Sequence, residues 1–150
     1  EFLVVCFKDK SETTLNPIMQ PVWDGEKYVE KLQPLETIID DMGTNSSAKD
    51  EIEGLFGNRD TFRTPKPVKI IKEFIRAGSD KHSIVMDFFA GSGTSGHAVM
   101  ALNREDNGNR KFILVTDNQN NICRSVTLPR LQKAAELCGY NENILFKSLI

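Results

Sequence analysis

Residues 83–100 read SIVMDFFAGSGTSGHAVM, and this stretch decides the fold. It opens on the apolar run SIVMDFF (residues 83–89), which is typical of a parallel strand buried on both faces. A GxGxxG pattern follows at Gly91, Gly93 and Gly96. A helix is predicted after it, from about Thr94 to Asn103. A strand, a glycine loop and a helix present backbone amides at a helix N-terminus, where an anionic or polar group can bind.

Regular elements flank this stretch on both sides. Upstream, TPKPVKIIKEFIRAG (residues 64–78) predicts an amphipathic helix with Pro67 at its first position and Gly78 as its C-cap. Downstream, KFILV (residues 111–115) predicts a second strand, so the unit reads βαβ with parallel strands. The remaining segments predict a third helix and a final strand, residues 128–138 and ILFKSLI (residues 144–150).

The first third of the chain differs in composition from the rest. Residues 2–7 (FLVVCF) predict a short strand, and residues 13–57 are rich in prolines, turns and polar side chains. We expect a loop-rich region there, with one helix from about Ala48 to Leu55 capped by Ser46 and Ser47.

Composition limits the function classes. The chain has 150 residues and 39% hydrophobic content, which suffices for one core. Its net charge of -2 gives no global reason to bind nucleic acid or an anionic membrane. The three cysteines, Cys6, Cys123 and Cys138, match no metal or disulfide pattern, so no metal site is assigned and a cytoplasmic location is expected. The chain starts at Glu1 inside an apolar run, which suggests a fragment.

The residues around the glycines leave two ligand classes open. A dinucleotide site needs an acidic residue after the second strand, and Asp117 is the candidate. A carboxylate at the strand tip, Asp87, instead suits a ligand with a positive amino group, and Phe88 and Phe89 supply an aromatic wall. S-adenosylmethionine combines an amino group, a carboxylate, a sulfonium and an adenosine. An NAD-dependent oxidoreductase domain remains the alternative.

Two segments also carry a family resemblance. DFFAGSGTS (residues 87–95) resembles the cofactor motif of amino-methylating DNA methyltransferases, and TPKP (residues 64–67) resembles their second cofactor segment. This order is that of the β class. Over residues 41–140 the chain is similar to the N6-adenine modification subunit of type III restriction-modification systems.

The resemblance implies an α/β, Rossmann-like S-adenosylmethionine-dependent methyltransferase fold, present here as its cofactor-binding half with a loop-rich N-terminal segment. It implies that residues 1–62 are the tail of a target-recognition or accessory region and that residues 63–150 bind S-adenosylmethionine. The implied partners are double-stranded DNA, the restriction subunit of the same system and a second copy of the chain, with no membrane. A non-catalytic module that binds DNA or a partner is a further alternative.

The implied cofactor site follows the motifs residue by residue. It comprises Thr64, Lys66, Pro67, Asp87, Phe88, Phe89, Ala90, Gly91, Ser92, Gly93, Thr94 and Asp117. Thr94 is expected to cap the following helix and to face the cofactor's carboxylate. Asp117 stands in for a glutamate that relatives often carry after the second strand. The Asp-Pro-Pro-Tyr type motif that grips the flipped adenine is absent, so no catalytic residue is assigned and the chain alone is expected to be inactive.

Other polar residues can be explained by ordinary structural roles. His97 is expected to be a partly exposed helical histidine, because methylation of an amine does not require a histidine base. A local basic stripe is either a contact for DNA phosphates or a solvated helix face, and it consists of Arg63, Lys66, Lys69, Lys72, Arg76 and Lys81.

Overall fold

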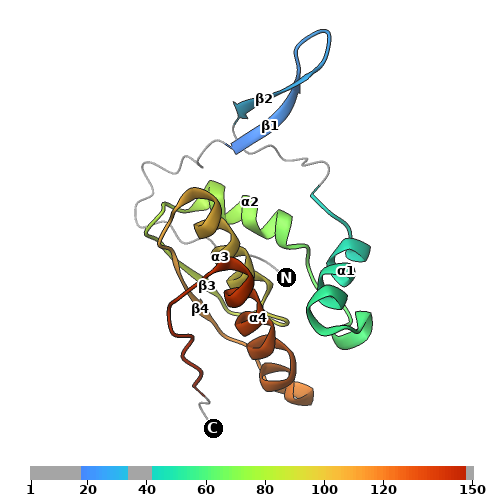
Figure 1. Ribbon diagram of the computed structural model, residues 1–150, viewed down its shortest axis with the longest axis vertical. Coiled ribbons are helices and arrows are strands. Elements are labelled where there is room, and N and C mark those ends of the chain that lie inside the picture. The colour runs from blue at the N-terminus through green and yellow to red at the C-terminus, as the bar shows by residue number, and fades with distance from the viewer. Residues whose placement is uncertain (1–17, 34–41, 148–150) are drawn as a thin grey trace.

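The structure is a computed structural model that describes residues 18–33 and 42–147 (Figure 1). In chain order the elements are β1 (Ile18–Trp23), β2 (Tyr28–Gln33), α1 (Asn45–Phe56), the 3₁₀ turn η1 (Arg59–Thr61), α2 (Val68–Gly78), β3 (Ile84–Asp87), α3 (Thr94–Asp106), β4 (Lys111–Leu114), the 3₁₀ turn η2 (Gln119–Asn121), the π-helical turn η3 (Cys123–Thr127) and α4 (Leu128–Cys138). The architecture mixes helices with a small parallel sheet and a separate hairpin.

The hairpin of β1 and β2 lies in the region predicted to be loop-rich, so that prediction is wrong for residues 18–33. The two strands are antiparallel, and Trp23 pairs with Tyr28 next to the turn. The Asp24 carboxylate accepts hydrogen bonds of 3.0 Å from the amides of Glu26 and Lys27, which closes the turn. In Figure 1 this hairpin stands at one end of the molecule, away from α4.

Helix α1 is longer at both ends than the predicted helix, and its cap differs. Thr44 is the N-cap, and its Oγ1 accepts from the amide of Ser47 at 3.2 Å. The amide of Thr44 donates in return to the hydroxyl of Ser47 at 2.8 Å, which completes a capping box. The predicted caps, Ser46 and Ser47, are therefore wrong, because both lie inside the first turn. Gly57 ends the helix in the left-handed conformation.

The capping box gives a stability prediction. Thr44→Ala removes the hydroxyl that pairs the Ser47 amide, and we expect it to lower the free energy of unfolding by about 1 kcal/mol in urea denaturation. Asn45→Ala, at the next and exposed position, is the control and is expected to change it by less than about 0.5 kcal/mol. Equal losses in the two variants would contradict the role of Thr44.

Strands β3 and β4 are parallel, as predicted, with Val85 paired to Phe112. Helices α2 and α3 cover one face of this pair through a cluster of Ile75, Ala98, Val99 and Leu102, against which Val85 and Phe112 pack. Helix α4 extends the same layer through Leu131 and Ala134, which pack with Met100 of α3 against Phe112 and Leu114.

The other face of the β3–β4 pair is open among the described residues, so the prediction of a strand buried on both faces is wrong here. Side chains along β3 alternate between exposed and half-buried, as one covered face requires. The exposed fractions on the open face range from 39% to 66%, at Ile84, Met86, Ile113 and Val115. We define these residues as the open face.

Helix α3 begins at Thr94, as predicted, and continues to Asp106, three residues beyond the predicted end. Gly96 sits where α3 meets α4 and β4. A Cβ atom there would lie 2.5 Å from Cδ2 of Leu131 and 3.0 Å from Cδ1 of Leu114. Glycine at this position therefore permits the close approach of the helices rather than a turn.

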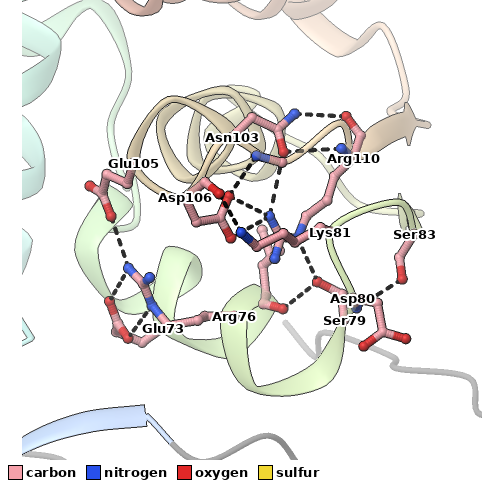
Figure 2. Close-up of polar contacts among 12 residues, drawn as sticks. Glu73, Arg76, Ser79, Asp80, Lys81, Ser83, Asn103, Glu105, Asp106 and Arg110 are labelled. Carbon is pink, nitrogen blue, oxygen red and sulfur yellow. Dashed lines mark hydrogen bonds and ion pairs between the residues drawn. The ribbon is translucent and has the colours of Figure 1, made fainter.

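A polar cluster fixes the far end of α3, opposite the glycine loop (Figure 2). Asn103 pairs with the backbone of Arg110 in both directions, at 2.9 and 3.0 Å. Arg110 is 2% exposed, and its guanidinium donates to the carboxylate of Asp106 and to the hydroxyl of Ser79. Because Ser79 follows α2 and Arg110 precedes β4, this cluster joins α2, α3 and β4 at one edge.

The C-terminal part is partly as predicted. Helix α4 spans Leu128–Cys138 and ends at Gly139 in the left-handed conformation, which confirms the prediction. Residues 144–147 form no strand, so the described part of the final predicted strand is wrong, and residues 148–150 and the predicted strand at residues 2–7 lie outside the described residues. In the described part of the chain, every helix is too short or too polar to cross a membrane.

Candidate functional site

The glycine loop starts where strand pairing ends. The amide of Val115 donates to the carbonyl of Asp87 at 2.8 Å, and the amide of Ala90 donates back to Val115 at 3.0 Å. The chain then turns sharply, with the amide of Gly93 donating to the carbonyl of Ala90 at 2.7 Å. Gly91 and Gly93 have φ angles of 49° and 82°, in the left-handed region that favours glycine. The loop delivers the chain to the N-terminus of α3.

The carboxylate of Asp87 is held in place by the loop that follows it. Its Oδ1 accepts from the amide of Phe89 at 2.9 Å, and its Oδ2 accepts from the hydroxyl of Ser95 at 2.5 Å. Each carboxylate oxygen can accept more than one hydrogen bond, so the group can still receive a donor from a ligand. Its orientation is therefore set before a ligand binds.

A cavity of about 210 Å³ lies between the loop and α2. The predicted site residues that line it are Thr64, Lys66, Asp87, Phe89, Ala90, Gly91, Ser92 and Thr94. The structure thus brings the two sequence segments, residues 64–67 and 87–95, to one cavity.

Four predicted site residues do not line the cavity. Phe88 points elsewhere and is 49% exposed, and Asp117 is exposed beyond β4. Pro67 is buried as the N-cap residue of α2, and Gly93 is buried on the side of the loop that faces Thr127. Both Phe88 and Phe89 lie in the turn that follows β3, and only Phe89 lines the cavity.

The cavity also has walls outside the predicted site residues, formed by Phe62, Ile70, Ile71, Phe74 and Ser95. Ile71 and Phe74 belong to the helix predicted as amphipathic, and its pattern could have placed them near the loop. Nothing in the sequence around Phe62 indicated a wall of the site.

Thr94 does not cap α3, so that prediction is wrong. Gly93 is the N-cap residue and has no side chain to cap with. The hydroxyl oxygen of Thr94 lies 3.5 Å from the carbonyl of Lys66, to which it donates, and 2.8 Å from Nη1 of Arg130. This hydroxyl therefore links the segment before α2 to the loop, and both to α4.

The turn η3 and the start of α4 support the loop from behind. The hydroxyl of Thr127 donates to the carbonyl of Gly91 at 2.6 Å. A Cβ atom on Gly93 would lie 3.1 Å from Cγ2 of Thr127, so the loop and η3 are in close contact. Thr127 ends the π-helical turn η3, and π-helical turns are frequent at functional sites. Neither Thr127 nor Arg130 was identified from the sequence.

Comparison with known proteins identifies the family. A sequence profile described as DNA methylase matches residues 1–128. The chain belongs to this DNA methylase family.

Curated relatives agree with this assignment. The chain is 51% identical over 89 residues to the type III restriction-modification enzyme StyLTI Mod subunit of Salmonella typhimurium, covering 59% of this chain and 14% of the relative. It is 42% identical over 76 residues to the EcoPI Mod subunit of Escherichia phage P1, covering 51% and 12%. It is also 42% identical over 71 residues to the type II methyltransferase M.KpnI of Klebsiella pneumoniae, covering 47% and 17%. The chain spans less than a fifth of the length of these relatives.

His97 is not placed for proton transfer at neutral pH. Burial, reinforced by the positive charge of Arg130, lowers the pKa of His97 to about 4. Its Nδ1 is buried and has no hydrogen-bond partner among the described residues. The imidazole is therefore uncharged at pH 7, in keeping with a structural role in α3.

The basic stripe is partly neutralised by contacts within the chain. Lys72 and Arg76 both form ion pairs with Glu105 on α3. The ammonium of Lys81 donates to the backbone carbonyl of Asp106 at 2.6 Å. These contacts tie α2 and its following loop to α3, which favours the interpretation of a structural helix face over a phosphate contact at these positions. In the described part of the chain, no group of three or more His, Cys, Asp or Glu side chains could hold a metal ion.

Proposed function

We propose that this chain is the S-adenosylmethionine-binding part of a DNA methyltransferase that methylates adenine at N6 in a type III restriction-modification system. One observation carries the proposal. The cavity has a fixed carboxylate, Asp87, at the tip of β3 and the N-terminus of α3 beside it. A carboxylate and a helix N-terminus on one cavity suit a ligand that bears both an ammonium and a carboxylate group.

The residues present fit that ligand. The methionine part of the donor is a zwitterion, and Asp87 and the α3 N-terminus offer opposite charges to its two ends. Phe62, Phe74 and Phe89 give the cavity aromatic walls for the sulfonium and adenosine parts. The volume of about 210 Å³ is below the roughly 300 Å³ of small complete ligand sites, so we infer that further residues complete the adenosine side.

The fold that supports this function is a partial Rossmann-like sheet. A complete doubly wound sheet carries helices on both faces, whereas the β3–β4 pair carries them on one. We propose that residues 63–150 are the donor-binding portion and that residues 1–62 are the tail of a target-recognition region. Glu51 of α1 accepts from the amide of Val68 through both carboxylate oxygens, at 3.2 Å, so α1 packs on the donor-binding portion.

The donor would supply the methyl group, and the described residues would bind and orient it. We propose that the predicted site residues that line the cavity contact the donor, with Asp117 as the candidate for the ribose. Double-stranded DNA, a restriction subunit and a second copy of the chain are the proposed partners, in the cytoplasm. The 150 residues contain no Pro-Pro pair, so we propose that the isolated chain transfers no methyl group.

Calorimetric titration of the chain with S-adenosylhomocysteine tests the proposal. Asp87→Asn removes the negative charge but keeps the size of the side chain, and we expect it to weaken binding by roughly 10- to 100-fold, because a charge-assisted hydrogen bond contributes about 1.5 to 3 kcal/mol. Asp80→Asn, on the exposed loop after α2, is the matched control and should leave affinity unchanged. Tighter binding of NADH than of S-adenosylhomocysteine would sink the proposal in favour of a dinucleotide site.

A further inference from the structure

Arg130 is a fully buried arginine directly behind the glycine loop. It lies in the first turn of α4, its side chain is 0% exposed, and it is three residues after Thr127, so both face the loop from one side of the helix. Its Nη1 donates to the hydroxyl oxygens of Ser92 and Thr94, each at 2.8 Å. Arg130 does not line the cavity itself, whereas both hydroxyl residues do.

This contact makes both hydroxyl oxygens hydrogen-bond acceptors. A guanidinium can only donate hydrogen bonds, so Ser92 and Thr94 each accept from Arg130 and must direct their own hydrogens elsewhere. Their oxygens lie 3.3 Å apart, and that of Thr94 also lies 3.5 Å from the carbonyl of Lys66. Within the chain, Ser92 can donate to Thr94 and Thr94 can donate to that carbonyl. Because both of these contacts are long, an acceptor in the cavity can compete for either hydroxyl hydrogen.

The charge of Arg130 is incompletely neutralised. Its nearest carboxylate is that of Glu51, with Nη2 and Oε2 3.6 Å apart, and the Glu51 side chain is 30% exposed. Nε and Nη2 have no hydrogen-bond partner among the described residues. Burial lowers the pKa of Arg130 to about 10, which still leaves the group charged at neutral pH. A positive charge thus sits behind the N-terminus of α3, where the helix dipole has the same sign.

Stability alone does not explain such a residue. Replacing a buried ion pair by apolar side chains of similar volume is often neutral or stabilising, so a methionine would serve packing at least as well. The buried positive charge of Arg130, in contrast, favours an anion next to the two hydroxyls. The Asp87 carboxylate lies on the same cavity and favours a cation there. The cavity is therefore polarised, with a cation-binding end and an anion-binding end.

We propose that Arg130 is a positioning residue that makes the Ser92 and Thr94 end of the cavity selective for a carboxylate. It would act through the two hydroxyls and through its charge, without touching the ligand. This inference rests on the proposed function, because the carboxylate in question is that of the methionine part of S-adenosylmethionine.

The test compares two ligands that differ only in that carboxylate, S-adenosylmethionine and decarboxylated S-adenosylmethionine, each titrated calorimetrically into the chain. Arg130→Met is expected to weaken binding of the first by roughly tenfold or more, the effect of losing charge-assisted hydrogen bonding, while binding of the second changes less than about twofold. Arg130→Lys keeps the charge, but its ammonium is one bond closer to the backbone than Nη1 and contacts the two hydroxyls less well, so its loss should be smaller and confined to the same ligand.

Controls separate this role from folding and from net charge. Arg104→Met removes one positive charge at an exposed position of α3 whose guanidinium donates to the carbonyl of Leu137, and it should change neither affinity. Circular dichroism melting shows whether each variant is folded. If Arg130→Met does not fold, the ratio of the two affinities in Arg130→Lys decides the matter.

Each outcome supports or overturns the inference. A selective loss for the ligand that carries the carboxylate supports it. Equal losses for both ligands, with the wild-type chain binding both, would overturn the inference and leave the proposed function standing. Failure of the wild-type chain to bind either ligand would overturn the proposed function and the inference together.

Discussion

Gly91→Val is expected to weaken binding of S-adenosylhomocysteine by more than about 100-fold while leaving the chain folded. Gly91 lines the cavity at a φ of 49°, where a side chain costs about 1 to 2 kcal/mol and a β-branched one more. The nearest protein atoms to an added Cβ are Cζ of Phe62 at 3.6 Å and the carbonyl of Phe89 at 3.8 Å. These are ordinary contacts, so the chain can hold the side chain, and the two methyl groups would take space from the ligand.

The matched control for this variant is Gly57→Val. Gly57 has a φ of 72° at the end of α1, and no atom lies within 4 Å of an added Cβ. It therefore suffers similar backbone strain without a cavity beside it. Calorimetry should show unchanged affinity for Gly57→Val, and melting should show similar stability losses in both variants. Full affinity in Gly91→Val would remove the glycine loop from the proposed site.

Gly96→Val is expected to give the largest loss of stability, about 3 kcal/mol, the upper range for overpacking a well-packed core. The added Cβ alone would lie 2.5 Å from Leu131 and 3.0 Å from Leu114, and a ring atom of Phe112 lies 3.3 Å away. All three side chains belong to the layer between α4 and β4, so none can move without disturbing the others. The melting temperature should fall by roughly 6 to 12 °C.

Gly54→Val provides the comparison for that variant. Gly54 is also inside a helix, α1, but nothing lies within 4 Å of an added Cβ. Valine has a slightly better helix propensity than glycine, so we expect a change smaller than about 1 kcal/mol. The difference between the two variants in the loss of unfolding free energy measures the cost of the steric overlap with α4. Similar melting temperatures for both would show that α3 and α4 do not pack as closely as described.

The sequence allowed prediction of those elements whose signals are local. Pro129 and Gly139 mark the two ends of α4, and its bounds agree with the structure. The glycine loop between β3 and α3 is also local, because glycine, strand and helix patterns follow each other along the chain. The hairpin of β1 and β2 was missed because Pro21 and charged residues interrupt the apolar alternation that signals a strand.

The cavity lining of the candidate site was largely predicted from the sequence, whereas the contacts that support the glycine loop from behind were not. The two motifs supply most of the cavity lining, since residues 64–67 and 87–95 each carry a recognisable pattern. The contacts from α4 could not be predicted, because Thr127 and Arg130 lie 36 and 38 residues from the loop positions that they bind. The open face was missed for a related reason, since an apolar run does not reveal which of its sides is covered.

The brace from α4 has a consequence for protein engineering. A designer who transplants residues 87–96 into another scaffold would carry over the glycines and the carboxylate, but not the hydroxyl that holds the Gly91 carbonyl or the guanidinium behind Ser92. The smallest portable unit therefore runs from β3 to the end of α4. A search that scores the short glycine pattern alone assumes that the loop keeps its shape without other contacts. The shape of this loop is instead maintained by a helix that lies much later in the sequence.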